Sequence, residues 1–197
     1  MEILTLIKSR RSIRVYEEKS IEDDQLKIVL EAARWAPTGA NLQPWHFIVI
    51  RDKKMREEIG KYAKFFFLKS AHVQNAPCII VLCYEKNKGR FGIYDATLAG
   101  ANILIMAQSL GLGTCWIGAF DEMKIKQLLD IPENVAVVAL ITIGYPKENP
   151  DPPPRFELEK IVHYENWHNV KEKSFVETIS KSGPLSILKK FFKYVSI

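Results

Sequence analysis

One long helix is predicted between residues 92 and 110, and it is apolar almost all the way round. Ile93, Leu98, Ile103 and Ile105 are among its apolar residues, and together they point to every side of the helix. A helix of this kind must be buried on all sides. In a chain of 197 residues, the simplest solution packs one face on a sheet and another face on a second subunit.

The rest of the chain predicts helices that alternate with strands. Helices are expected over residues 2–10, 21–35, 53–64 and 122–129, and strands over 46–50, 78–84, 114–117 and 135–143. The strand at 78–84 is apolar on both faces, which is typical of the interior of a sheet. We therefore expect an α+β fold in which helices cover both faces of a mixed sheet.

Composition excludes several classes of function. The three cysteines form no CxxC pair and the four histidines no HExxH pattern, so neither a disulfide framework nor a metal site is expected. The net charge of +5 is gathered almost wholly in residues 171–197, which argues against a nucleic-acid-binding surface. No apolar run could cross a bilayer, and the N-terminus lacks the order of a signal peptide. These features favour a soluble, cytoplasmic protein without a membrane partner.

Three arginines, Arg10, Arg11 and Arg14, lie within five residues of one another, with Ser12 among them. Guanidinium groups this close repel one another unless an anion lies between them, and they bind phosphate and carboxylate oxygens in pairs. The alternative is a solvated basic helix end, where the same charges interact favourably with the helix dipole.

The segment 36–45 is predicted to be an irregular, rigid loop, because its prolines and glycine disfavour helix and strand. Thr38, Asn41 and Gln43 supply small neutral donors and acceptors. Such groups suit the edge of a polar heterocycle that offers both donor and acceptor atoms. An ordinary capped loop before a strand has a similar composition, so both interpretations stay open.

The glycine-rich segment 111–118 is not a dinucleotide-binding fingerprint, because a helix precedes it and a strand follows it. We expect a helix C-terminal cap at Gly111 or Gly113. The end of the following strand, at Ile117 and Gly118, would let a ligand approach the backbone. Cys115 is expected to be structural, because apolar neighbours would raise the pKa of its thiol.

Two further charged residues are open to interpretation. Asp95, near the start of the apolar helix, is expected to be a helix-end or packing residue and not a base. Arg155 follows a run of prolines, which makes the segment before it stiff and extended. This arginine lies either on the surface or within reach of an anion.

Four motifs follow one another in order along the chain. They are Arg10-Arg-Ser-x-Arg14, Ala36-Pro-Thr-Gly-x-Asn-x-Gln-Pro-Trp45, Gly111-Leu-Gly-Thr-x-Trp-Ile-Gly118, and Gly144-Tyr-Pro146 with the proline-rich run that ends at Arg155. The set resembles the nitroreductase family of FMN-dependent oxidoreductases. The resemblance covers about residues 1–165, which would form a nitroreductase-like FMN-binding domain. Residues 166–197 would be a C-terminal helical extension that packs on the same or the partner subunit, with a basic membrane-surface helix as the alternative.

The resemblance implies an intertwined homodimer with two FMN sites, each built from both subunits. Arg10, Arg11, Ser12 and Arg14 would hold the phosphate, ribityl chain and pyrimidine edge, and Arg155 would join the phosphate. The other subunit would contribute Pro37, Thr38, Asn41 and Gln43. Ile117 and Gly118 would offer backbone N–H groups around flavin N5. The family also places one polar side chain after the third helix near the flavin, and the sequence does not identify which residue of 64–75 this is.

The resemblance further implies an oxidoreductase that takes hydride from NADH or NADPH and reduces an electrophilic acceptor, such as a nitroaromatic, a quinone or an enone, by a ping-pong mechanism. Flavin N5 would carry the chemistry, so no catalytic side chain is expected. Three alternatives stay open: an FMN-binding or redox-sensing protein without turnover, a family member with specialised chemistry such as reductive dehalogenation, and an interaction protein driven by its C-terminal tail.

Overall fold

The computed structural model describes residues 2–65, 68–69 and 71–167. The chain divides into two compact units, Met1–Pro150 and Asp151–Ile197, and each is described here by itself. The predicted domain boundary at residue 165 stays a prediction, and most of the predicted C-terminal extension lies outside the described residues. No helix within the described ranges is long and apolar enough to cross a membrane.

Four strands form the central sheet of the first unit, and every neighbouring pair is antiparallel. Their order is β1-β4-β6-β5. The bounds are Trp45–Ile50 for β1, Cys78–Glu85 for β4, Gly113–Ile117 for β5 and Val135–Gly144 for β6. β4 lies inside the sheet and is buried on both faces from Cys78 to Cys83, as its unbroken apolar sequence predicts. A short antiparallel hairpin adds β2, Lys64–Phe65, and β3, Leu68–Lys69.

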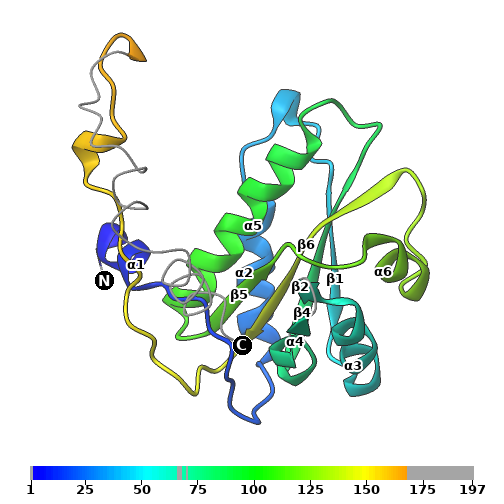
Figure 1. The fold of residues 1–197 in the computed structure, drawn as a ribbon. Helices are drawn as coiled ribbons and strands as arrows, with labels where there is room; N and C mark the ends of the chain where they lie inside the picture. The colour runs from blue at the N-terminus through cyan, green and yellow to red at the C-terminus, as the bar shows by residue number, and fades with distance from the viewer. Residues whose placement is uncertain (1, 66–67, 70, 168–197) are drawn as a thin grey trace. The chain divides into compact units, whose positions relative to one another are not determined.

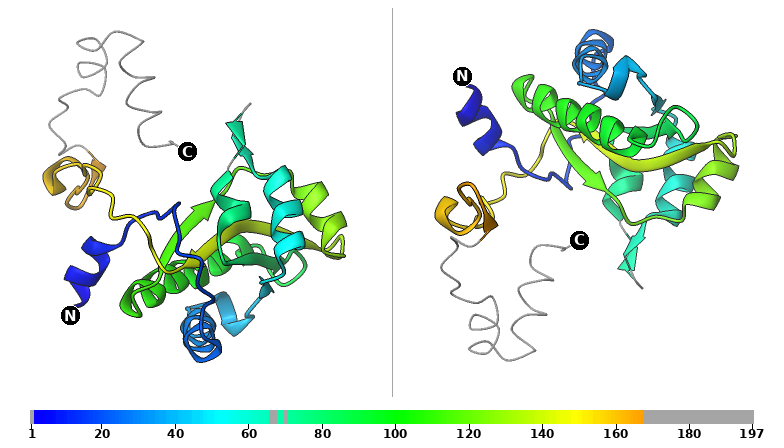
Figure 2. Two further views of the ribbon diagram at one scale, coloured as in Figure 1. Left: turned by 90° about the horizontal axis from the view of Figure 1, so that it is seen from below. Right: turned by 90° about the horizontal axis from the view of Figure 1, so that it is seen from above.

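Helices cover both faces of this sheet (Figure 1, Figure 2). The helices of the first unit are α1 Ile3–Ser9, α2 Asp23–Arg34, α3 Lys53–Tyr62, α4 Ala71–Asn75, α5 Gly92–Ser109, α6 Glu122–Leu128 and the 3-10 turn η1 Gly39–Asn41. α2 and α5 share one core cluster with the sheet, which includes Val29 and Ile103. α3 and α6 share the cluster on the opposite face, which includes Ile59 and Ile125. The α+β class with helices on both faces is thereby confirmed.

α5 is buried along one side and exposed along the other. Its inner side packs on the sheet and α2 through small and branched residues, namely Ala96, Ala99, Gly100, Ile103 and Ala107. Gly100 permits this close approach, since a Cβ there would overlap the Trp116 ring and lie 2.9 Å from Leu82 Cδ2. On the outer side, Ile93, Tyr94 and Leu98 are at least 44% exposed. The part of the chain that the structure describes therefore does not supply the predicted second cover of this helix.

We predict that Gly100→Val lowers the free energy of unfolding by about 1–3 kcal/mol, the usual cost of overpacking a core. The added side chain would meet the rigid Trp116 ring. Glu57→Val is the control, because it places the same β-branched side chain at an exposed position of another helix, α3. Urea unfolding of both variants checks the prediction, and equal losses would contradict it.

Candidate functional site

The arginine segment, residues 10–16, runs alongside β5 at the edge of the sheet. Ser12 forms a parallel bridge with Thr114, and the N–H of Ile13 donates to the Thr114 carbonyl at 2.9 Å. Gly113 makes room for the segment, because a Cβ there would lie 2.6 Å from Ile13 Cγ1. The first and third sequence motifs therefore meet side by side.

The chain after β6 holds the arginine segment on its other side. Tyr16 forms an antiparallel bridge with Pro146, and the N–H of Lys147 donates to the Val15 carbonyl at 2.9 Å. The Glu148 carboxylate accepts from the backbone N–H groups of both Arg14 and Val15. The start of the fourth motif thus joins the first and third, and the backbone at Arg14 is fixed from both sides.

Arg10 and Arg14 direct positive charge toward β5. Burial raises the pKa of the Cys115 thiol above its usual value, and the charges of Arg14 and Arg10 act against this rise. Both guanidinium groups are therefore within electrostatic reach of the strand. The thiol is buried and free, in agreement with the structural role expected for it.

Arg11 makes a different set of contacts. Its Nε donates to the carbonyl of Pro150 at 3.1 Å, and its Nη1 donates to the carbonyls of Lys8 and Arg10 at 2.7 and 2.8 Å. These hydrogen bonds tie the end of α1 to the segment after β6. Arg11 supports the backbone of the site in this way, while its predicted contact with a cofactor stays a prediction.

His72 of α4 is a site candidate that the sequence did not identify. Both of its ring nitrogens are buried, and neither has a hydrogen-bond partner among the residues that the structure describes. Burial is the main cause that lowers the pKa of His72 to about 4; Arg14 lowers it further and Glu148 opposes the effect. A buried polar group without a partner costs free energy and calls for an explanation. A ligand beside Arg14 would supply the missing hydrogen bonds.

The end of β5 is open to a ligand, as its glycine predicts. Ile117 is buried, whereas Gly118 is exposed, and a Cβ at Gly118 would have only Trp116 Nε1 within 4 Å, at 3.9 Å. Ile117 lies about 10 Å along the strand from Thr114, which contacts the arginine segment. At the other end, Gly111 has a φ of +74° and ends α5 as the predicted C-terminal cap.

The loop over residues 37–43 lies at the other end of α5 from the arginine segment (Figure 1). The Thr38 hydroxyl donates to Asp95, near the start of the helix, at 3.0 Å. Ser9, which precedes Arg10, accepts from Gln108 near the end of the helix at 3.4 Å. Asp95 and Gln108 are 13 residues apart in α5, which is about 20 Å along the helix. One chain thus places Arg10, Ser12 and Arg14 along β5. It keeps Pro37, Thr38, Asn41 and Gln43 near the other end of α5.

Arg155 belongs to the second unit, whose described residues include the 3-10 turn η2, Leu158–Lys160. Its Nη1 donates to the carbonyls of Pro153 and Pro154, at 3.3 and 3.1 Å. These local bonds fix the side chain against the proline run. Its predicted approach to a phosphate at the arginine segment stays a prediction.

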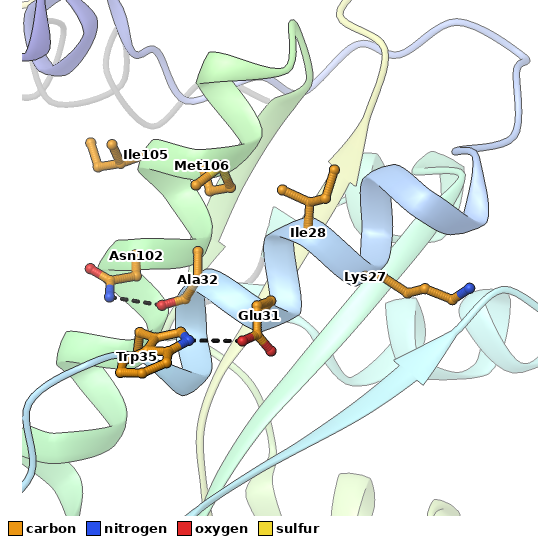
Figure 3. Close-up of a pocket in the computed structure, with 8 residues that line it drawn as sticks. All are labelled: Lys27, Ile28, Glu31, Ala32, Trp35, Asn102, Ile105 and Met106. Carbon is orange, nitrogen blue, oxygen red and sulfur yellow. Dashed lines mark hydrogen bonds between the residues drawn. The ribbon is translucent and has the colours of Figure 1, made fainter.

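A groove of about 780 Å³ runs between α2 and α5 and contains none of the predicted site residues. Figure 3 shows the eight residues that line it, namely Lys27, Ile28, Glu31, Ala32, Trp35, Asn102, Ile105 and Met106. The Asn102 amide donates to the Ala32 carbonyl at 2.9 Å, which joins the two helices. Trp35 is 73% exposed at the rim. This apolar groove lies beside the exposed side of α5 and offers no cluster of charges for catalysis.

We predict that His72 makes the stability depend on pH between about 4 and 6.5. In the unfolded chain the His72 imidazole is protonated with its usual pKa of 6.5, and in the folded chain its pKa is about 4. The unfolded state therefore binds more protons in that window, so the stabilisation is complete above pH 6.5 and is lost as the pH falls. Between pH 7 and 5 the wild type should lose about 1 kcal/mol more than His72→Gln, a discounted value because the side chain is partly exposed.

Urea unfolding at both pH values measures this difference. His46→Gln, which removes an exposed imidazole, is the control and should keep the pH dependence of the wild type. A His72→Gln variant with the same pH dependence as the wild type would refute the assignment.

Comparisons with known proteins show the family to which the chain belongs. The family described as Nitroreductase family matches residues 7–71 and 64–145. A protein of Archaeoglobus fulgidus named as an NADH dehydrogenase/NAD(P)H nitroreductase is 37% identical over 177 residues, which cover 84% of this chain and 99% of the relative. An FMN reductase of Bacillus subtilis that uses NAD(P)H is 26% identical over 194 residues, 87% of this chain and 76% of the relative. The solved structure of an FMN-dependent nitroreductase from Clostridium difficile matches with a TM-score of 0.76 and 31% identity, over 83% of this chain and 99% of that one. The chain belongs to the nitroreductase family.

Proposed function

We propose that this protein is a homodimeric, FMN-dependent oxidoreductase that takes hydride from NADH or NADPH and reduces an electrophilic acceptor by a ping-pong mechanism. The acceptor is a nitroaromatic, a quinone or an enone. One observation carries the proposal. The segment with Arg10, Ser12 and Arg14 runs along β5, and His72 lies near Arg14 with both ring nitrogens buried and without a hydrogen-bond partner among the described residues. The relatives named for FMN and NAD(P)H support the same cofactor and donor.

The residues at this place fit FMN, which combines an anionic phosphate with a flat, polar ring. Arg10 and Arg14 provide cations for an anionic group. His72 provides one nitrogen that donates and one that accepts in its neutral form, which matches a heterocycle edge. Gly118 leaves its backbone open to close approach. When bound, FMN supplies hydride transfer at N5.

The protein's part is to bind, orient and stabilise charge. Arg14 places a fixed positive charge where negative charge would develop on a reduced ring, and such a preorganised charge needs no rearrangement during the reaction. Glu148 holds the Arg14 backbone in place through the hydrogen bonds described above. His72 is neutral at pH 7, since its pKa is about 4, and so it adds hydrogen bonds without adding charge.

A homodimer is supported by the distance between the two halves of the site. The loop at 37–43 and the arginine segment contact α5 at Asp95 and near Gln108, about 20 Å apart along the helix, so a single chain does not bring them together. A second copy that packs on the exposed side of α5 would cover Ile93, Tyr94 and Leu98 and bring its own loop to the arginine segment. The groove beside α5 adds apolar area to this interface.

We predict that the purified protein binds FMN and oxidises NADH or NADPH steadily when menadione is supplied. Arg14→Ala should weaken FMN retention at least tenfold, the equivalent of about 1.4 kcal/mol, and lower the reduction potential of the bound flavin. Lys61→Ala is the control, since it removes one positive charge from the distant helix α3. Absorbance, equilibrium dialysis and a redox titration measure these changes.

Two results would contradict the proposal. A protein that remains colourless after reconstitution with FMN would refute flavin binding. A protein that binds FMN without turning over either nucleotide with menadione would favour the non-turnover, redox-sensing alternative.

We predict that Leu98→Glu separates the two subunits and removes FMN binding. A carboxylate on the exposed apolar side of α5 would be buried without a partner in a dimer. Light scattering after size-exclusion chromatography gives the mass. Glu122→Gln on α6, away from this side, is the control and should leave the mass unchanged. A Leu98→Glu variant that stays dimeric and keeps its flavin would place the interface elsewhere.

A further inference from the structure

The loop between Thr38 and Gln43 has an unusual backbone. Ala40, Asn41 and Gln43 have φ values of +49°, +56° and +45°. Residues with a Cβ adopt this left-handed region at a cost, and they keep it only where the surroundings impose it. Three such residues within four positions mean that some contact outside the loop holds it in shape.

Asp95 makes that contact. The side chain is on the first turns of α5 and is buried, with 6% of its surface exposed. Its Oδ2 accepts from the Thr38 hydroxyl at 3.0 Å, and both of its oxygens lie 3.3 Å from the Gly39 N–H, which donates to them. A carboxylate is also well placed here because it faces the positive end of the helix dipole.

The hydrogen bonds continue from Thr38 into the strained part of the loop. The Thr38 oxygen accepts from the Gln43 N–H at 3.1 Å, and the Gln43 side chain donates to Asn41 Oδ1 at 3.1 Å. An unbroken chain of hydrogen bonds thus runs from Asp95 to the two exposed amide side chains. These amides are the groups predicted to meet a cofactor.

We propose that Asp95 is a positioning residue that presets the loop at 37–43 for a flavin bound mainly by the other subunit. The inference rests on the proposed function, because it needs both FMN and the dimer. A loop held in its binding shape before the ligand arrives loses less conformational freedom on binding. Without Asp95 the loop would relax toward ordinary φ values, and its amides would no longer be aligned.

Single substitutions test the chain of hydrogen bonds. Asp95→Ala should speed FMN dissociation about tenfold or more, and Asp95→Asn less, because its amide oxygen still accepts from Thr38. Thr38→Val should resemble Asp95→Ala, whereas Thr38→Ser, which keeps the hydroxyl, should resemble the wild type. If Asp95 and Thr38 act through one network, the double variant will dissociate FMN about as fast as either single variant. Multiplied effects of the two substitutions would overturn the proposal.

Asp52→Ala controls for a general loss of stability. The Asp52 side chain caps α3 by accepting a hydrogen bond from the Met55 N–H at 2.9 Å. Loss of such a cap lowers the free energy of unfolding by about 1 kcal/mol. This variant should have a lower melting temperature with the FMN dissociation rate of the wild type. An equal acceleration in Asp52→Ala and Asp95→Ala would mean that Asp95 has only a structural role.

A heterodimer of two different variants shows whether Asp95 affects the flavin bound by the arginine segment of its own chain or of the partner chain. One chain carries Asp95→Ala and the other Arg14→Ala, with different affinity tags, and the heterodimer is isolated after co-expression. If Asp95 acts across the interface, one site has both residues intact and the other has both defects. Half of the flavin should then dissociate at the wild-type rate.

If Asp95 serves the flavin of its own chain, every site carries one defect and no wild-type phase will be seen, which would overturn the proposal. Wild-type protein that neither binds FMN nor dimerises would instead overturn the proposed function itself. Asp95→Asn in place of Asp95→Ala keeps the experiment decisive if the alanine variant does not fold.

Discussion

The contact between α5 and the sheet sets the distances on which the other features depend. Gly100 lets the helix approach the Trp116 ring closely, and this fixes the long axis of α5 across the face of the sheet. The arginine segment is then attached near one end of the helix, and the loop at 37–43 near the other. Because a helix is rigid over such a length, the arginine segment and the loop at 37–43 keep a constant separation.

Charge at the arginine segment is balanced by a small number of contacts. Arg10 and Arg14 bring positive charge to the edge of β5, and Arg11 is engaged with backbone carbonyls. Glu148 accepts hydrogen bonds from the backbone N–H groups of Arg14 and Val15 in the same segment. These hydrogen bonds hold the backbone of the arginine segment in place.

Much of the fold could be predicted from the sequence, because the periodic patterns are long and the turns carry proline or glycine. The predicted strands and helices agree with the structure to within about two residues at each end, as expected for such boundaries. The apolar helix was predicted to be buried all round, but one chain covers only its inner side. The reason is physical. An apolar pattern indicates which faces of a helix are buried, but it does not indicate whether the same chain or a second chain buries them.

The site was harder to predict, since its parts meet through tertiary contacts. The Ser12–Thr114 bridge joins segments about a hundred residues apart, and no local pattern indicates it. His72 lies in a helix of five residues, which is too short to show a helical periodicity. Its position near Arg14 could therefore not be predicted from the sequence. Asp95 was correctly expected to pack at a helix start, yet its hydrogen bonds to the loop depend on a fold that the pattern alone does not give.

The exposed apolar side of α5 also matters before the protein is complete. A newly synthesised chain that has folded alone carries Ile93, Tyr94 and Leu98 in contact with water, and such a surface adheres to other unfinished chains. In the proposed homodimer, this surface would stay exposed from release from the ribosome until the chain meets its partner. Translation of neighbouring copies from one messenger would shorten that interval, and a chaperone that shields the helix would make it safe.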